Sequence, residues 1–224
     1  IGADPDDAIH IQGFDPASET GALDRIEFDD GTTLTYAELI ARGTDVIGTA
    51  GDDLLIGTNV HDRLIGGAGN DTYRLTTADD ATDEIIEAEN QGIDTVESAI
   101  DHSLAPHVEN LLLTGNAITA TGNALDNTLA GNALDNVLTG GEGSDTYRFA
   151  RQSGNDLLID GGANRIALDA GLSLDDLAAS RDGDDLLLAI RRDTGSVRVQ
   201  GYFTDGTPWQ VSDAEGNGST TETL

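Results

Sequence analysis

Short glycine-led repeats are the feature that most constrains this chain. Two blocks of nine-residue units run without a gap, over residues 48–74 (GTAGDDLLI, GTNVHDRLI, GGAGNDTYR) and 122–148 (GNALDNTLA, GNALDNVLT, GGEGSDTYR). The sixth position is Asp or Asn in every unit. The eighth is apolar in all six, as Leu55, Leu64, Tyr73, Leu129, Leu138 and Tyr147. A fixed period of this kind is typical of a solenoid of stacked coils.

The spacing within a unit predicts its local geometry. Six Gly-rich residues suit a turn in which some positions need positive φ, and the last three suit a short strand whose middle side chain faces inward. Two units then complete one coil of eighteen residues. Strands of stacked coils lie about 4.8 Å apart. Asp53 and Asp71 should therefore lie side by side on one edge, with Asp62 on the opposite edge.

Stacked carboxylates need compensation in so acidic a chain. Asp and Glu number 42 against 11 basic residues, for a net charge of -31. At a separation of about 5 Å and an effective dielectric near 20, each carboxylate pair repels by roughly 3 kcal/mol. A few such pairs rival the whole stability of a domain, about 5 to 15 kcal/mol. The stack therefore predicts a cation between coils, and the charge argues against nucleic acid and anionic membranes as partners.

Calcium is the cation that this donor set favours. Carboxylates and turn carbonyls are hard oxygen ligands, which suit Ca²⁺ better than zinc or copper. The chain has no cysteine, and no apolar run approaches the roughly 18 residues of a membrane span. We expect several Ca²⁺ ions. The candidate ligands are Gly48, Gly51, Asp53, Gly57, Asp62, Gly66, Gly67, Gly69, Asp71, Asp83, Asp94, Gly122, Asn127, Gly131, Asn136, Gly140, Gly141, Gly143, Asp145 and Asp156.

Two units carry a family resemblance. GGAGNDTYR and GGEGSDTYR match the pattern G-G-x-G-x-D-x-U-x, and residues 108–127 (VENLLLTGNAITATGNALDN) are similar to joining segments of the same proteins. The chain resembles the RTX (repeats-in-toxin, haemolysin-type calcium-binding) family. That resemblance implies an all-β fold, a right-handed parallel β-roll that binds Ca²⁺ in its turns. It also implies a fragment of a larger protein that a type I secretion apparatus exports, secreted or held at the bacterial cell surface.

Departures from the pattern weaken some sites. Asn127 and Asn136 replace Asp at the sixth position, and a neutral side chain there predicts weak or empty sites. For these two turns a metal site and a plain turn are equally favoured. Asp126 and Asp135 stand one residue earlier, where their side chains should point differently. We therefore expect the first block to bind calcium better than the second.

Between the blocks, the coil pattern continues with longer turns. TDEIIEA (82–88) and GIDTVES (92–98) place Asp83 opposite Asp62 and Asp94 opposite Asp71. Further strands are expected at 111–113, 157–159 and 165–167, with Asp156 beside Asn136. These segments predict one calcium-binding roll over residues 48–168, although two shorter rolls remain an alternative.

The flanks read as caps. Residues 1–47 predict a strand, an Asp-Gly turn and a helix from about Thr35, whose Glu38 completes a capping box. AIHIQGF (8–14) matches SVRVQGY (196–202), so this flank reads as the end of a preceding repeat unit. Residues 169–224 predict a β-rich cap and tail with a short helix after Ser173 and an antiparallel pair around residues 193–195. Outward-facing Leu54, Ile56 and Ile65 are candidates for burial under a flank.

The function that follows is binding rather than catalysis. The chain lacks H-E-x-x-H, G-x-S-x-G and phosphate-loop signatures. The sequence predicts a non-enzymatic calcium-binding module that folds on extracellular Ca²⁺, with the export apparatus and neighbouring repeats of the same chain as partners. Two alternatives stay open: a rigid calcium-dependent spacer of a surface adhesin or S-layer-like protein, and an accessory region of a secreted hydrolase or polysaccharide-modifying enzyme.

Overall fold

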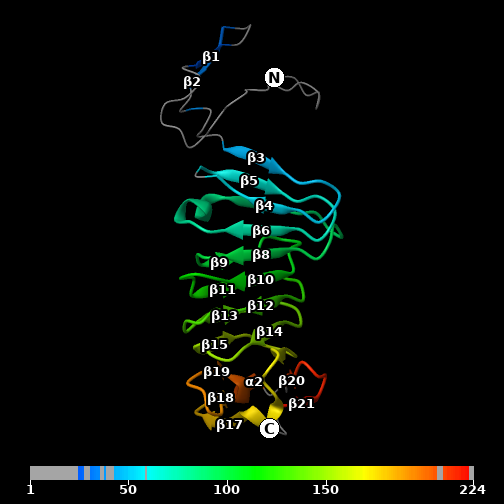
Figure 1. Cartoon of the computed structure of the whole chain (residues 1–224), viewed down its shortest axis with the longest axis vertical. Coiled ribbons are helices and arrows are strands. Elements are labelled where there is room, and N and C mark those ends of the chain that lie inside the picture. Colours follow the sequence, from blue (N-terminus) through cyan, green and yellow to red (C-terminus); the bar gives the residue numbers. More distant parts are fainter. Residues whose placement is uncertain are drawn as a thin grey trace.

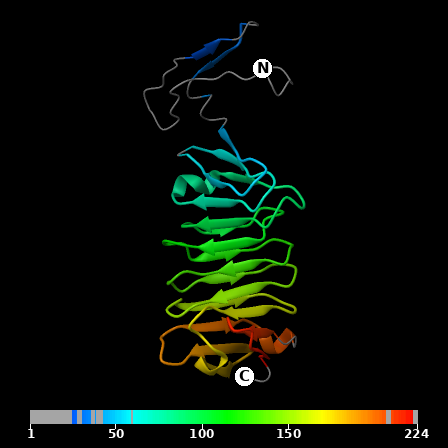
Figure 2. The same ribbon diagram turned by 45° about the vertical axis from the view of Figure 1, so that its right-hand side comes forward.

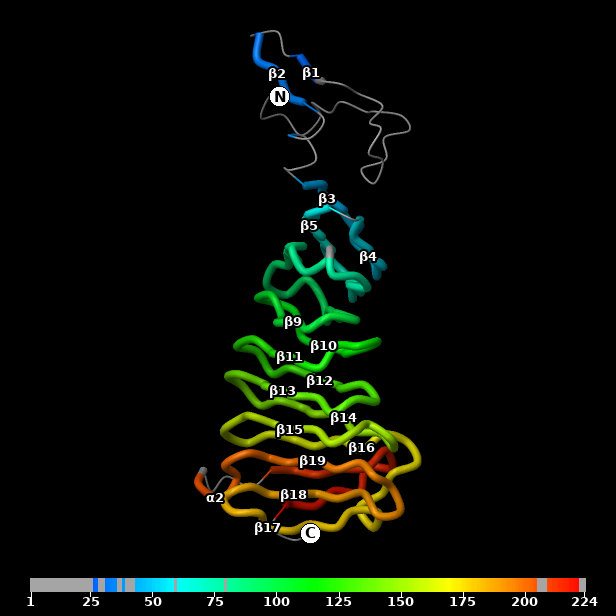
Figure 3. Tube along the Cα trace, turned by 90° about the vertical axis from the view of Figure 1, so that its left-hand side faces the viewer, coloured from blue at the N-terminus to red at the C-terminus, as the bar shows by residue number. Residues whose placement is uncertain are grey.

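The protein is an elongated column of stacked coils (Figure 1). The computed structural model describes residues 25–27, 31–35, 38, 43–58, 60–205 and 209–221. Strands dominate, and the coils are flattened so that strands lie on two opposite faces (Figures 2 and 3). None of the described helices approaches the length of a membrane span. The all-β parallel solenoid expected for a β-roll is confirmed.

One face is a continuous nine-stranded sheet. Its strands are parallel from β4 to β20, and β21 closes it in the antiparallel sense. In order they are β4 (Leu54–Ile56), β6 (Thr72–Leu75), β8 (Thr95–Ser98), β10 (Asn110–Leu113), β12 (Thr128–Ala130), β14 (Thr146–Phe149), β16 (Arg165–Leu168), β20 (Gln210–Ser212) and β21 (Gly218–Thr220).

The opposite face is divided into two sheets. The first holds β3 (Thr44–Ile47), β5 (Asp62–Ile65) and β7 (Glu84–Ile86). The second holds β9 (His102–Ser103), β11 (Thr119–Thr121), β13 (Val137–Thr139), β15 (Asn155–Ile159), β19 (Ser196–Val199), β18 (Asp185–Ile190) and β17 (Leu177–Asp182). Because the other face is unbroken, the coils form one solenoid rather than two rolls.

The nine-residue period maps directly onto this architecture. In β4, β12 and β13 the strand occupies the last three positions of its unit. The register pairs Leu55 with Tyr73 and Leu129 with Tyr147, a displacement of one eighteen-residue coil. All six eighth-position side chains are buried in the core, including the two tyrosines. The periodicity therefore predicted both the strands and the core column.

Several coils outside the repeats are longer or shorter than eighteen residues. The 3₁₀ helix η1 (Ala78–Thr82) lengthens the turn before β7, so Tyr73 pairs with Val96. The expected coil segments at 82–88 and 92–98 form β7 and β8, and the strands expected at 111–113, 157–159 and 165–167 form β10, β15 and β16. β9 and β11 were not foreseen, because neither carries the unit pattern.

The parallel ladders run past both expected limits of the roll, residues 48 and 168. At one end β3 pairs with β5, and at the other β19 and β20 extend the two faces. Within the C-terminal segment Ser173 caps η2 (Leu174–Asp176), and β18 pairs antiparallel with β19, as predicted. α2 (Tyr202–Asp205) follows β19. Trp209 is buried and stacks on Tyr147, with ring centroids 5.4 Å apart.

The N-terminal segment contains a hairpin that matches the C-terminal one. β1 (Arg25–Glu27) pairs with β2 (Thr33–Thr35), and the predicted capping box is present, since Thr35 N–H and Oγ1 both donate to Glu38 Oε2 (2.8 Å each). The two hairpins share one register. Arg25 pairs with Thr35 in the first, just as Gln210 pairs with Thr220 in the second. This shared register supports the long-range repeat, although AIHIQGF lies outside the described residues.

The expected burial of outward-facing apolar residues at the start of the roll is wrong for two of them. Leu54 and Ile56 are 52% and 48% exposed, while Ile65 is partly buried. Both exposed side chains lie on β4, which is the terminal strand of its sheet. Strand alternation gave their direction correctly, but the sequence could not say what lies over them.

Leu138→Ala tests the core column. Leu138 is fully buried, and removing its side chain should cost about 2 to 5 kcal/mol of the free energy of unfolding. Leu134→Ala is the matched control from the same unit, because Leu134 is 40% exposed; it should change stability by less than about 0.5 kcal/mol. Urea unfolding in calcium measures both. Equal effects would contradict the inward orientation of the eighth position.

Candidate metal centres in the turns

Sixth-position residues of neighbouring coils are linked by hydrogen bonds along each edge. The backbone N–H of Asp53 donates to Asp71 Oδ1, and that of Asp71 donates to Asp94 Oδ1 (2.8 Å each). On the opposite edge, Asp62 N–H donates to Asp83 Oδ1 (2.8 Å). The structure thus brings together the acidic pairs expected from the spacing.

The second block follows the same rule. Asn127 N–H donates to Asp145 Oδ1 (2.7 Å), and Asn136 N–H donates to Asp156 Oδ1 (2.8 Å). Asp145 N–H in turn donates to Asn164 Oδ1 (2.7 Å). Backbone donors therefore offset part of the repulsion that the sequence argument assigned wholly to a cation.

In four of these aspartates the other carboxylate oxygen has no hydrogen-bond partner. Within the described part of the chain, the buried carboxylate oxygens without a hydrogen-bond partner are Oδ2 of Asp71, Asp83, Asp145 and Asp156, and Oε2 of Glu87. A buried charged oxygen with no partner is strongly unfavourable. A hard cation between the coils would supply the missing partner, and oxygen donors of this kind fit Ca²⁺.

Two of these aspartates, Asp71 and Asp145, lie in turns that share a distinctive glycine conformation. In the unit 66–74, Gly67 and Gly69 adopt left-handed φ values of 101° and 117°, and Gly141 and Gly143 do so in the unit 140–148. Asp71 and Asp145 then keep one oxygen without a donor.

Units with Thr or Asn at the second position form a different turn. There the second residue donates its N–H to the sixth side chain, as from Thr49 to Asp53 Oδ2 (2.5 Å) and from Asn123 to Asn127 Oδ1 (2.7 Å). Thr58 N–H and Oγ1 likewise donate to Asp62 Oδ2. In the two units with glycine at the second and fourth positions, the aspartate at the sixth position therefore keeps one carboxylate oxygen without a hydrogen-bond partner.

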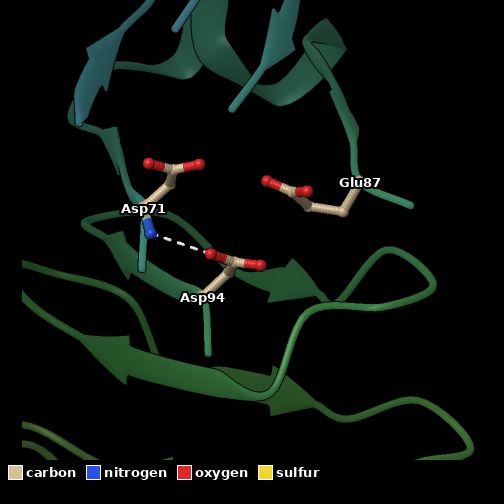
Figure 4. Close-up of side chains that lie close together, drawn as sticks. All are labelled: Asp71, Glu87 and Asp94. Atoms are coloured by element: carbon tan, nitrogen blue, oxygen red, sulfur yellow. Dashed lines mark hydrogen bonds between the residues drawn. The ribbon is translucent and has the colours of Figure 1, made fainter. Parts of the chain in front are cut away.

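Asp71, Glu87 and Asp94 form a buried carboxylate cluster (Figure 4). One oxygen from each residue lies within 4.8 Å of the others. Tyr73 Oη donates to Glu87 Oε1, so the hydroxyl of a core tyrosine faces the cluster. Burial, together with neighbouring acids, raises the pKa values of Glu87 and Asp94 above their ordinary range. This cluster is the most complete candidate metal centre among the described residues.

A second centre of the same plan lies in the second block. Tyr147 Oη donates to Asp160 Oδ2 (2.5 Å), and burial with Asp160 nearby raises the pKa of Asp145 to about 7. Asn164 takes the position of Asp94, since it accepts the N–H of Asp145. The second centre therefore has one carboxylate fewer than the first.

Glu87 and Asp160 were missed by the sequence analysis. Each directly follows a strand, β7 or β15, at the position where a unit would begin with glycine. An acid in place of that first glycine was the signal that could have identified both. The first glycine of the preceding consensus unit faces them. A Cβ on Gly66 would overlap Asp71 Oδ2, Tyr73 Oη and Glu87 Oε1, and a Cβ on Gly140 would overlap their counterparts.

The opposite edge holds two further acids with a buried free oxygen. Burial raises the pKa of Asp83 to about 6 and that of Asp156 to about 7. A Cβ on Gly57 would overlap Asp83 Oδ2, so this glycine also permits a close approach of the carboxylate.

The remaining candidate glycines have structural positions of their own. Gly48 and Gly122 approach the carbonyl oxygens of Gly66 and Gly140 in the next coil, and Gly131 approaches Asn136 Oδ1. Gly51 has open space around it. Unpartnered oxygens occur in both blocks, at Asp71 and Asp145, and the first centre has one carboxylate more than the second. Stronger calcium binding by the first block stays a prediction. A ligand role for each predicted residue stays a prediction.

Gly66→Ala tests the first centre. The new methyl group would collide with the carboxylates of Asp71 and Glu87, so calcium binding should weaken by at least about tenfold, or about 1.4 kcal/mol. Gly51→Ala is the matched control, because its Cβ would meet only Thr49 Oγ1 at 3.9 Å. Calorimetric calcium titration compares them. Unchanged affinity in Gly66→Ala would contradict the proposed packing of this centre.

The raised pKa values predict how the metal-free fold depends on pH. Asp83, Asp145 and Asp156 have pKa values of about 6 to 7 when folded, against an ordinary 3.8. Between these values the folded chain binds more protons than the unfolded chain, so stability should fall as pH rises from about 4 to 7. Far-UV circular dichroism in excess chelator should therefore show more strand signal at pH 5 than at pH 8. The opposite slope would show that these acids are not destabilising when ionised.

Comparison with known proteins agrees with this geometry. The family model of the RTX calcium-binding nonapeptide repeat matches residues 46–80 and 121–151, and that of the haemolysin-type calcium binding protein related domain matches residues 3–38. The two segments matched by the nonapeptide-repeat model contain the two blocks of units, 48–74 and 122–148.

Two curated relatives come from Rhizobium meliloti (strain 1021). Endo-1,3-1,4-beta-glycanase EglC is 31% identical over 175 residues, which cover 71% of this chain and 37% of the relative. Endo-1,3-1,4-beta-glycanase ExsH is 34% identical over 100 residues, 44% of this chain and 21% of the relative. The aligned regions are thus minor parts of both relatives. With its calcium-binding nonapeptide repeats wound into a parallel β-solenoid, the chain belongs to the RTX proteins of the haemolysin type.

Proposed function

We propose that this chain is a module that folds when calcium fills its turns, within a longer exported protein. The observation that carries the proposal is the set of buried carboxylate oxygens without partners on both edges of the roll. Ca²⁺ at these oxygens would replace the missing donors and neutralise the stacked acids. The free energy of binding then contributes directly to the free energy of folding.

The Asp71, Glu87 and Asp94 cluster is the best-supported site. Three buried carboxylates converge there, and two of them keep an unpartnered oxygen. Without a cation, the folded state must either hold adjacent negative charges or take up protons, and both destabilise it at neutral pH. Asp145 with Asp160, Asp62 with Asp83, and Asp156 are the further sites that we propose for additional ions.

Calcium-coupled folding suits an exported protein. RTX proteins are typically exported. Low cytosolic calcium would leave the carboxylates uncompensated and the chain open, while extracellular calcium would fill sites of about 10⁻⁴ to 10⁻³ M affinity, as in other extracellular modules. We propose a type I secretion apparatus as the export partner and a secreted or cell-surface location, on the basis of family membership.

Far-UV circular dichroism during calcium titration tests the coupling. Strand signal should be low in excess chelator and rise with a midpoint of about 0.1 to 1 mM calcium. Asp71→Asn should move that midpoint severalfold higher, because it removes a carboxylate from the cluster. Asp175→Asn is the charge-matched control, since Asp175 is exposed in η2, away from the turns of the roll. Full strand signal in chelator would defeat the proposal.

The names of the relatives favour a second proposal, which concerns the longer protein and is compatible with calcium-coupled folding. Both are named endo-1,3-1,4-beta-glycanases. We propose that this chain is the non-catalytic accessory region of a secreted enzyme that acts on a β-linked polysaccharide, rather than the spacer of an adhesin. Assay of the longer protein and of residues 1–224 on a 1,3-1,4-β-glucan tests this. Oligosaccharide release by the longer protein alone is expected, and no release by either would contradict it.

A further inference from the structure

We propose that the two turns built on Asn127 and Asn136 are closed by side-chain amides in place of calcium. The coils between the two tyrosine-containing centres, β9 to β13, would then keep their structure when calcium is removed. This proposal rests on the calcium-coupled folding proposed above and identifies the part of the roll that does not require the metal. Figure 3 shows these coils in the middle of the column.

On one edge, two asparagines donate to the carbonyl oxygens of the preceding coil. Asn123 Nδ2 donates to Ala105 O and Val108 O (2.7 Å each). Asn127 Nδ2 donates to Val108 O and Glu109 O (3.2 Å each), while its Oδ1 accepts the N–H of Asn123. The amide hydrogens thus lie among carbonyl oxygens, where a cation would otherwise be the positive partner.

The opposite edge repeats this arrangement nine residues later. Asn132 Nδ2 donates to Thr114 O (3.2 Å) and Ala117 O (2.6 Å). Asn136 Nδ2 donates to Ala117 O (3.2 Å), and its Oδ1 accepts the N–H of Asn132 (2.8 Å). Two independent turns therefore use the same pair of amides in the same way.

These turns contrast with the aspartate turns in their hydrogen bonding. Asn127 and Asn136 are each 1% exposed, yet neither has a polar side-chain atom without a partner. Asp126 and Asp135, one residue earlier, are exposed and accept the N–H of Ser144 and Asn155 in the next coil. Those carboxylates are therefore directed away from the amides. A calcium ion at Asn127 or Asn136 would have to displace amide donors without gaining a carboxylate.

The consequence is an uneven dependence on calcium along the column. The Asp71 centre and the Asp145 centre lie on either side of coils in which the buried sixth-position side chains, Asn127 and Asn136, are neutral amides with hydrogen-bond partners. Removing calcium should open the two outer regions first, because only they are left with uncompensated buried carboxylates. The middle coils would then serve as the structured region onto which the outer coils refold.

Hydrogen–deuterium exchange of the intact chain, with calcium and with excess chelator, tests this. In chelator, amides of β10 to β13 should exchange at least about tenfold more slowly than those of β5, β6 and β14, a difference of about 1.4 kcal/mol in opening free energy. Uniform loss of protection would overturn the proposal while leaving calcium-coupled folding intact. Uniform protection in chelator would contradict calcium-coupled folding and this proposal together.

Matched variants assign the effect to the amides. The double variant Asn127→Asp, Asn136→Asp removes the Nδ2 donors and buries two carboxylates, so the middle coils should lose their protection in chelator. The control double variant Asp71→Asn, Asp145→Asn changes the same number of charges in the outer centres and should leave the middle protection unchanged. Protection of the middle coils that survives the asparagine substitutions would show that the amides do not hold them.

Discussion

Buried carboxylates stacked from coil to coil are the constraint on which the rest of this structure depends. Each accepts a backbone N–H from the neighbouring coil through one oxygen, which fixes the register of the edge. The second oxygen of Asp71, Asp83, Asp145 and Asp156 has no donor in the described chain. The same residues therefore position the coils and create the need for a cation. In a chain with a net charge of -31, the proposed calcium ions would meet that need locally, turn by turn.

Glycine placement distinguishes the turns of the two consensus units from the other turns of the repeat blocks. Left-handed glycines at the second and fourth positions give the turn of the two consensus units, and the first glycine leaves room for a second acid and a tyrosine hydroxyl. Where Thr or Asn stands at the second position, its N–H closes the turn onto the sixth side chain. Both kinds of turn thus occur within one fold without disturbing the core column beneath them.

Much of this was accessible from the sequence, for identifiable reasons. The period of nine and the apolar eighth position gave the strands, the core and the pairing of Asp53 with Asp71 and of Asp62 with Asp83. The roles of Glu87 and Asp160 were missed, because an acid at the first position of a unit does not by itself show that its carboxylate faces the first glycine of an earlier coil. The acceptors of the asparagine side-chain amides were hidden too, since Ala105, Val108 and Ala117 contribute only backbone carbonyl oxygens, which any residue carries. The burial of Leu54 and Ile56 was predicted wrongly, because strand alternation gives the direction of a side chain but not the residues that surround it.

The central claim is that a divalent cation joins the acids of neighbouring coils. A crystal structure grown with calcium and examined by anomalous difference density tests it most directly. The account predicts a peak at the Asp71, Glu87 and Asp94 cluster, about 2.3 to 2.6 Å from the carboxylate oxygens that lack a hydrogen bond. A well-ordered cluster at millimolar calcium with no anomalous peak would contradict it.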